Sequence, residues 1–263
     1  MTSRIAETLT ERIGNIGEPF LVRFDEGHGH TSYRLVRMQP SRIATQTEIQ
    51  KDGKLLTFLM KAVAVVRIQN HIEVDPDRPT IAAGNHQSLL DVFMAAAFCY
   101  QANVGCRLLV QARYFDNKLA GRWLRRIGCI PLSSDNKDEA FAEVRAALER
   151  RELVGIMPEG RLTKPERRNP QVGPFRVGVA QLARETGAVV RPITFHRSGL
   201  AWPRGKWPKI RFRNRPIVTM ILGDPIELHG VDDLENTKLI EIAMTELLTD
   251  LDAEVAALGQ PPA

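Results

Sequence analysis

A histidine precedes an aspartate by five positions in residues 84–91, which read GNHQSLLD. On a regular helix, five steps of about 100° would leave His86 and Asp91 roughly 140° apart, so one helix cannot bring them together. They can meet if a strand ends at Gly84, His86 lies in the next loop, and Asp91 lies in the first turn of a helix. Asp91 would then accept the Nδ1 proton of His86 and leave Nε2 to take a proton from a hydroxyl group. The spacing therefore allows a general base held by a carboxylate, or a histidine that only satisfies a backbone carbonyl.

A second candidate segment, residues 157–161 (MPEGR), directly follows a stretch that is typical of a buried strand. The carboxyl ends of strands are where α/β sheets bind ligands. Gly160 allows a backbone N–H to approach an anion, and Arg161 supplies a planar cation that suits a phosphate. The segment predicts an anion site, and the plainer alternative is a turn with a surface ion pair.

The two segments resemble motif blocks of the glycerolipid acyltransferases, the PlsC-like family of lysophosphatidic acid and glycerol-3-phosphate acyltransferases. The NHxSxxD block of that family is matched by Asn85, His86, Ser88 and Asp91, and its PEG block by Pro158, Glu159, Gly160 and Arg161. Two later segments, residues 175–193 and the GDPI of residues 223–226, are similar to further blocks. The resemblance covers about residues 70–230, with the blocks in the family's order.

The resemblance implies direct transfer of a fatty acyl group from acyl-CoA or acyl carrier protein to a lysophospholipid hydroxyl, with no metal and no other cofactor. The expected acceptor is 1-acylglycerol-3-phosphate, which would give phosphatidic acid. His86 would deprotonate the hydroxyl and Asp91 would hold the imidazole. The substrate-binding residues that the resemblance implies are Asn85, Ser88, Glu159, Gly160 and Arg161. We expect the Ser88 hydroxyl to cap a helix or support the structure, and not to act as a nucleophile.

Two positions depart from the family pattern. The second block commonly has an arginine soon after a Gly-x-Ile strand, but residues 128–135 contain none, and Arg125 and Arg126 could substitute. The third block is EGRL where EGTR is common. These departures keep other acceptors open, namely glycerol-3-phosphate or a lyso-aminolipid. An inactive peripheral protein that binds anionic lipid is the non-enzyme alternative, which the intact pair of His86 and Asp91 disfavours.

The segments that must position these residues alternate between strand and helix patterns. The predicted strands are residues 80–83, 106–110, 127–132, 153–157, 188–195 and 210–222, and the predicted helices are residues 89–100, 137–151, 175–186 and 234–258. This alternation predicts an α/β fold with a mixed, mostly parallel sheet flanked by helices. We expect a single catalytic domain over residues 54–263. Residues 1–53 form an N-terminal extension whose role the sequence leaves open, with a short helix at 3–13 and a hairpin of residues 19–24 and 32–38.

Basic residues gather in residues 191–215, which contain eight lysines and arginines and no aspartate or glutamate. The whole chain carries a net charge of +5, so an anionic partner is expected. Trp202 and Trp207 stand beside these charges, a composition typical of membrane-interface anchors. We predict membrane contact at Trp202, Trp207, Arg211 and Arg213. A charged edge strand that blocks edge pairing is the alternative.

Residues 55–68 form the most apolar stretch, which we expect to be either a second membrane anchor or a buried helix. No stretch reaches the roughly 20 apolar residues of a spanning helix, and residues 1–14 lack the apolar core of a signal peptide. Three unpaired cysteines suggest a reducing compartment. We therefore expect a cytoplasmic protein bound peripherally to the inner face of the membrane.

Other classes of partner are disfavoured by what the basic segment and the histidines lack. No nucleic-acid-binding motif accompanies the basic segment, so nucleic acid is not an expected partner. His28 and His30 fall in an expected turn without a carboxylate cluster, so no metal site is predicted.

Overall fold

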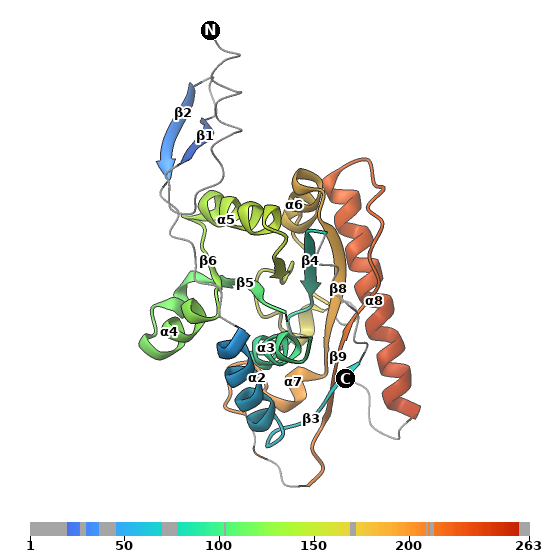
Figure 1. Cartoon of the computed structure of the whole chain (residues 1–263). Helices are drawn as coiled ribbons and strands as arrows, with labels where there is room; N and C mark the ends of the chain where they lie inside the picture. Colours follow the sequence, from blue (N-terminus) through green and yellow to red (C-terminus); the bar gives the residue numbers. More distant parts are fainter. Residues whose placement is uncertain are drawn as a thin grey trace. The chain divides into compact units, whose positions relative to one another are not determined.

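The structure is a computed structural model that describes residues 20–26, 30–36, 46–69, 78–102, 104–168, 172–208, 210 and 213–257 (Figure 1). The chain divides into two compact units, Met1–Arg42 and Ile43–Ala263. In the smaller unit, β1 (Phe20–Glu26) pairs antiparallel with β2 (His30–Val36). The predicted hairpin is confirmed, whereas its turn and the helix predicted at residues 3–13 lie outside the described residues.

The larger unit contains a seven-stranded sheet with the order β3-β9-β8-β4-β7-β5-β6. Its strands are β3 (Val65–Gln69), β4 (Thr80–Gly84), β5 (Cys106–Gln111), β6 (Ile130–Leu132), β7 (Leu153–Ile156), β8 (Val189–His196) and β9 (Ile217–Leu222). β8 and β9 pair antiparallel, and the other five pairings are parallel. The predicted mixed, mostly parallel sheet is therefore confirmed.

Strand β5 changes its partner along its length. Residues 106–108 pair with β7, whereas residues 109–111 pair with β6. Pairing between β5 and β7 thus stops at Leu108 and Gly155, although both strands continue. The sheet opens between these two strands toward their carboxyl ends.

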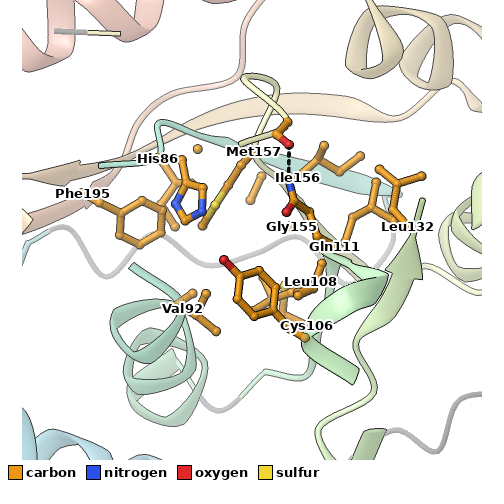
Figure 2. A pocket seen from close by; sticks show the side chains of 18 of the residues that line it. His86, Val92, Cys106, Leu108, Gln111, Leu132, Gly155, Ile156, Met157 and Phe195 are labelled. Carbon is orange, nitrogen blue, oxygen red and sulfur yellow. Dashed lines mark hydrogen bonds between the residues drawn. The ribbon is translucent and has the colours of Figure 1, made fainter. Parts of the chain in front are cut away.

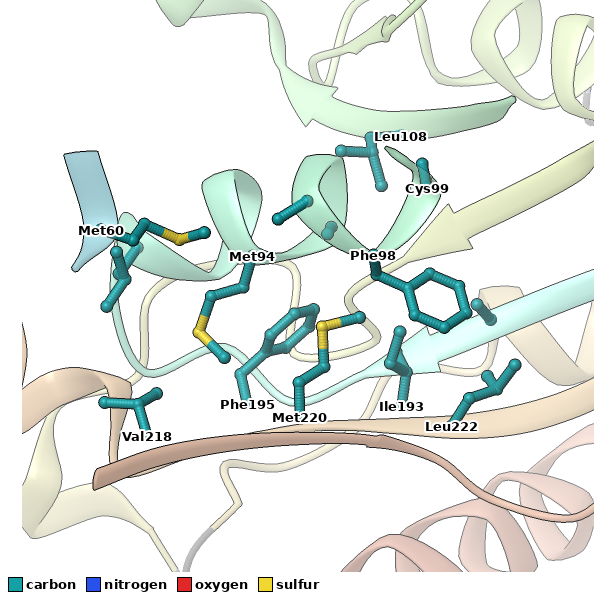
Figure 3. Packing of buried hydrophobic residues seen from close by; sticks show 14 of the residues in the cluster. Met60, Met94, Phe98, Cys99, Leu108, Ile193, Phe195, Val218, Met220 and Leu222 are labelled. Atoms are coloured by element: carbon teal, nitrogen blue, oxygen red, sulfur yellow. The ribbon is translucent and has the colours of Figure 1, made fainter. Parts of the chain in front are cut away.

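Helices pack on both faces of the sheet and bury two apolar clusters. The helices are α2 (Gln46–Met60), α3 (Leu90–Ala102), α4 (Lys118–Arg126), α5 (Lys137–Glu149), α6 (Gly178–Thr186), α7 (Ser198–Ala201) and α8 (Asp233–Ala257), with short 3-10 turns at Ala112–Phe115 and Pro165–Arg167. The first cluster joins α2, α3, α4 and α7 to the sheet, and Figure 3 shows Met94 and Phe98 of α3 above Phe195 and Met220. The second joins α5, α6 and α8 to the other face. Successive strand residues alternate between the clusters, as Ala82 and Ala83 do.

Local chemistry accounts for where several elements begin and end. Gly187 follows α6 with φ of +66°, the left-handed conformation that terminates helices, as the sequence predicts. Asn117 accepts bonds from the backbone N–H groups of Leu119 and Ala120, both at 3.0 Å, and so starts α4. The sequence analysis did not predict α4.

Three sequence predictions need correction. The apolar run of residues 55–68 is not one helix, because α2 ends at Met60 and edge strand β3 begins at Val65. The last strand begins at Ile217, not at residue 210, because Asn214 has φ of +52° and Pro216 follows it. Two arginines of the basic segment, Arg191 and Arg197, are buried and do not belong to a charged surface.

The larger unit includes α2 from its first residue, which lies before the predicted boundary at residue 53. The role of residues 1–53 stays a prediction. Among the described helices, none combines the length and the apolar character that crossing a bilayer requires.

Candidate active site

His86 and Asp91 meet at the carboxyl end of β4. The strand ends at Gly84, His86 follows in a loop, and Asp91 is the second residue of α3. Nδ1 of His86 lies 2.9 Å from Oδ2 of Asp91. The predicted loop-and-helix arrangement of this pair is confirmed, and Nε2 is the ring nitrogen that remains for a substrate.

The Asp91 carboxylate is held by the backbone of the same loop. Its Oδ2 also accepts hydrogen bonds from the backbone N–H of Gln87 at 2.8 Å and of Ser88 at 2.9 Å. The carboxylate is fully buried at the amino end of α3, where the helix dipole favours a negative charge. With three donors on one oxygen, Asp91 fixes both the loop and the orientation of the imidazole.

Asn85 and Ser88 hold the loop through their own hydrogen bonds, and their role in substrate binding stays a prediction. Both residues are completely buried. Asn85 Oδ1 accepts the backbone N–H of Phe195 at 2.7 Å and so ties the loop to β8. Ser88 Oγ accepts from the backbone N–H of Leu90 at 3.0 Å and donates to the Trp202 carbonyl at 2.7 Å. The predicted capping role of Ser88 is therefore confirmed.

Glu159, which the sequence predicts as a substrate ligand, also holds the loop that carries His86. It is 3% exposed, and its Oε1 accepts the backbone N–H of His86 at 2.9 Å. Burial raises the pKa of Glu159 above its usual range, while hydrogen bonds from Thr163 and from the His86 backbone oppose that rise. Arg168 offsets the negative charge nearby: burial lowers the pKa of its guanidinium, and the charges of Glu159 and Asp91 oppose that decrease.

A cavity of about 480 Å³ opens beside His86 (Figure 2). This volume is within the roughly 300–1,000 Å³ that is usual for small-molecule sites. The wall is mainly apolar, and Figure 2 shows the His86 ring near Phe195 and Met157. The wall also includes a few polar side chains, which are His86, Gln111, Tyr114, Arg161 and Arg176.

Gly160 and Arg161 line this cavity, as the sequence predicts for an anion site. Gly160 has φ of +67°, and a Cβ added there would lie 3.0 Å from Nε of Arg176. Glycine at this position therefore allows a guanidinium to approach the loop closely. Arg161 and Arg176 together give the cavity a basic edge.

Sequence reasoning missed the roles of Gln111 and Arg176. Gln111 Nε2 donates to the Gly160 carbonyl at 2.8 Å and links the end of β5 to the loop after β7 (Figure 2). No motif marks Gln111, because its partner lies 49 residues away in sequence. Arg176 lies within a segment that resembles a motif block of the family. A basic side chain in such a block was the sequence signal that could have indicated an anion-binding residue.

Arg125 and Arg126 do not fill the position of the absent second-block arginine. Arg125 donates to the Phe115 carbonyl at 3.2 Å and lies over the Phe115 ring at 5.4 Å. Arg126 forms an ion pair with Asp52. Both guanidinium groups are thus engaged away from His86.

The two tryptophans of the basic segment have different environments. Trp202 lines the cavity, where its ring stacks on Phe93 at 5.6 Å, and Phe93 stacks in turn on Trp123 at 5.7 Å. Trp207 is 87% exposed. Arg213 is exposed before β9, and Arg211 lies outside the described residues. Trp207 is therefore accessible for the predicted membrane contact, whereas Trp202 belongs to the cavity wall.

The sequence matches the Acyltransferase family over residues 65–196, which is half of the chain. The chain belongs to this family. The matched residues include His86, Asp91, the loop at 158–161 and Arg176. Within the part of the chain that the structure describes, no group of three or more histidine, cysteine, aspartate and glutamate side chains is arranged to hold a metal ion.

Curated relatives in plants share this region. A chloroplast 1-acyl-sn-glycerol-3-phosphate acyltransferase of Arabidopsis thaliana is 25% identical over 170 residues, which are 64% of this chain and 45% of the plant protein. A chloroplast protein of the same description from Brassica napus is 26% identical over 132 residues, 49% of this chain and 36% of that protein. This chain therefore spans less than half the length of these relatives.

The fold is similar to that of a solved structure, the 1-acyl-sn-glycerophosphate acyltransferase PlsC of Thermotoga maritima. The TM-score is 0.61 at 21% identity, and the match covers 79% of this chain and 80% of that chain. The α/β architecture with its mixed sheet is thus shared with PlsC.

Proposed function

We propose that this protein is an O-acyltransferase that moves a fatty acyl group from a thioester to the hydroxyl of a lysophospholipid, with 1-acylglycerol-3-phosphate as the acceptor and phosphatidic acid as the product. The observation that carries the proposal is the contact of 2.9 Å between His86 and Asp91 at the wall of an apolar cavity with a basic edge. The family and the plant relatives support the same reaction class.

The geometry of the pair supports a direct transfer. Nε2 of His86 takes the proton of the acceptor hydroxyl as the oxygen attacks the thioester carbonyl carbon. The tetrahedral intermediate collapses, the C–S bond breaks, and the imidazolium returns its proton to the leaving thiolate. Asp91 keeps Nδ1 protonated and stabilises the imidazolium without accepting its proton. No enzyme nucleophile and no cofactor enter these steps, and acyl-CoA or acyl carrier protein supplies the thioester.

The basic edge of the cavity supports a phosphate on the acceptor. Arg161 follows Gly160 in the chain, the Arg176 side chain lies close to Gly160, and both arginines line the cavity where they could bind an anion. Arg176 is a candidate for the cation that the second block lacks. A glycerol-3-phosphate acceptor would use the same two arginines, whereas a lyso-aminolipid would leave them without a phosphate.

We also propose that the protein binds the surface of an anionic membrane. Exposed apolar side chains lie on α2 and in the loop before β9, and they are Leu55, Phe58, Leu59, Trp207 and Ile210. The residues that follow these two segments are in contact, because Arg215 donates to the Lys61 carbonyl and Val65 donates to the Pro216 carbonyl at 2.9 Å. Exposed basic residues flank them, namely Lys54, Lys61, Arg204, Lys206 and Arg213. Apolar insertion beside basic residues is the composition of a peripheral membrane site.

The decisive experiment measures thiol release and phosphatidic acid formation with oleoyl lysophosphatidic acid and either oleoyl-CoA or oleoyl-acyl carrier protein. Both products are expected from the wild-type protein, and neither from His86→Ala. An inactive lipid-binding protein would release no thiol with any lysophospholipid or with glycerol-3-phosphate, and that result would reject the proposed activity. Cosedimentation with vesicles of anionic or zwitterionic lipid, compared between the wild type and Trp207→Ala, tests the membrane surface separately.

A further inference from the structure

The cavity beside His86 draws its wall from both faces of the sheet. We define the α3 lobe by the lining residues of the first core cluster, Ala95, Phe98, Cys99, Leu108 and Leu124. We define the α6 lobe by the lining residues that belong to or pack on the second cluster, Leu109, Leu132, Phe141, Val179 and Leu182. A closed sheet would separate these two sets, so the cavity must pass through an opening in it.

The change of partner in β5 supplies that opening. Beyond Leu108 and Gly155, β5 no longer pairs with β7, and both strands line the cavity from there on. Gln111 crosses the gap with a single side-chain bond of 2.8 Å to the Gly160 carbonyl (Figure 2). The cavity therefore has one lobe on each face of the sheet, and His86 is part of its wall.

The two lobes differ in what stands at their openings. Arg176 precedes α6 by two residues, and α6 contributes Val179 and Leu182 to the α6 lobe. Arg176 thus stands just before the helix that lines the α6 lobe. The α3 lobe follows the helix that carries Asp91, and its lining side chains are apolar or thiols.

We propose that the lobes hold two different acyl chains: the α3 lobe holds the chain of the thioester donor, and the α6 lobe holds the chain that the acceptor already carries. The assignment rests on the proposed acyl transfer. In a lysophospholipid the phosphate and the ester-linked chain flank the reacting hydroxyl on one glycerol. With its phosphate at Arg161 and Arg176, such an acceptor brings its chain to the mouth of the α6 lobe. The enzyme then selects an acylated acceptor over glycerol-3-phosphate, which has no chain to bury.

Two adjacent residues of β5 provide a matched pair of variants. Leu109 packs with the second cluster and Val110 with the first, because successive strand side chains point to opposite faces. Both residues are half-buried and both line the cavity. Leu109→Trp narrows the α6 lobe, and Val110→Trp narrows the α3 lobe, on the same strand and with the same new side chain.

The readout is kcat/KM in two series. In the first, the acyl chain of the acceptor varies from 8 to 18 carbons while the donor stays the same. In the second, the acyl chain of the donor varies over the same range while the acceptor stays the same. Leu109→Trp is expected to penalise long acceptors against short ones by at least about tenfold, since even one methylene in an apolar pocket changes kcat/KM by about tenfold or more. Its donor profile should keep the wild-type shape. Val110→Trp should show the reverse. If both variants alter the chain-length profile of the same substrate, the lobes form one tunnel for one chain and the proposal is rejected. The proposal is also rejected if neither variant changes either chain-length profile.

Equilibrium dialysis of the same acceptors, without a donor, tests the α6 lobe independently of turnover. Wild-type affinity should rise with acceptor chain length, and this rise should be lost in Leu109→Trp and kept in Val110→Trp. If no thiol is released under any condition but this binding pattern holds, the proposed activity fails while the acceptor lobe stands. Should a tryptophan variant fail to fold, Leu132→Ala widens the α6 lobe instead. It should move the preferred acceptor to a longer chain, and an unchanged preference would overturn the proposal.

Discussion

Within the part of the chain that the structure describes, two histidine–aspartate pairs have opposite patterns of burial. In the first, the His86 ring is 13% exposed at the cavity and its partner Asp91 is completely buried. In the second, the His196 ring is completely buried at the end of β8, and its partner Asp252 on α8 is 28% exposed. Nε2 of His196 lies 2.7 Å from Oδ1 of Asp252, so the second pair uses the nitrogen that the first leaves for a substrate.

If His86 is the general base that we propose, then exposure of the ring, and not the presence of a carboxylate, distinguishes the proposed base from a structural histidine. A general base must present one ring nitrogen to the reacting hydroxyl, whereas the carboxylate can be buried if backbone N–H groups stabilise it. The His86 pair meets both conditions. The His196 pair instead ties β8 to α8, and its Nδ1 has no hydrogen-bond partner within the described part of the chain.

Replacing each of the two histidines by alanine, one at a time, is expected to give the largest difference in kcat. His86→Ala should lower kcat by about 10³-fold or more, because it removes the general base, with a small change in the free energy of unfolding. His196→Ala should keep kcat within about threefold and lower the free energy of unfolding by about 2–4 kcal/mol, since a buried polar pair is broken. Turnover and denaturant unfolding of both variants check this, and equal losses of turnover would remove the distinction between the pairs.

The two aspartates should differ in the same way. Asp91→Asn keeps the shape of the side chain but no longer stabilises the imidazolium, so kcat should fall by about 10²–10⁴-fold. Asp252→Asn should leave kcat nearly unchanged. Both are measured as kcat over a range of pH at saturating substrate. A comparable decrease in kcat for Asp252→Asn would place the second pair in the reaction after all.

The acid stability of the protein sharpens the comparison further. Burial lowers the pKa of His196, while Asp252 and Glu254 oppose this decrease. Below the unfolded-state pKa of about 6.5 the unfolded chain binds a proton that the folded ring does not yet bind. The free energy of unfolding should therefore decrease as the pH falls from about 6.5 toward the folded-state pKa, by up to about 1.4 kcal/mol per pH unit. Denaturant unfolding of the wild type and His196→Asn across this range should show a shallower decrease in the variant.

The smallest expected effect concerns the support of the active pair. Ser88→Ala removes the cap of α3 and should lower the free energy of unfolding by about 1–2 kcal/mol. Because Ser88 does not line the cavity, KM should stay within about twofold. Thermal unfolding and steady-state kinetics of this variant test the assignment, which a large increase in KM would contradict.

The sequence was most informative where a residue depends on near neighbours. The meeting of His86 and Asp91 follows from a strand end and a helix start within eight residues, and the strand–helix alternation predicts the sheet. Long-range packing was not visible in the same way. Arg191 looked like a surface charge, but its Nε donates to the Gly223 carbonyl at 2.9 Å across 32 residues. Gln111 and the opening beside β5 depend on similar distant pairings, which local patterns do not encode.

The pairing of β3 with β9 has a consequence for how the protein is made. The two strands are parallel, with Val65 opposite Ile217, so they lie roughly 150 residues apart in sequence. At about 5–20 residues per second, a ribosome would need on the order of 10–30 s after making β3 to deliver its partner. Strand β4, which leads to His86, pairs with β7 and β8, and both are synthesised before β9. The catalytic end of the sheet can therefore assemble on the nascent chain while its outer edge, next to the exposed apolar side chains of α2, is still open.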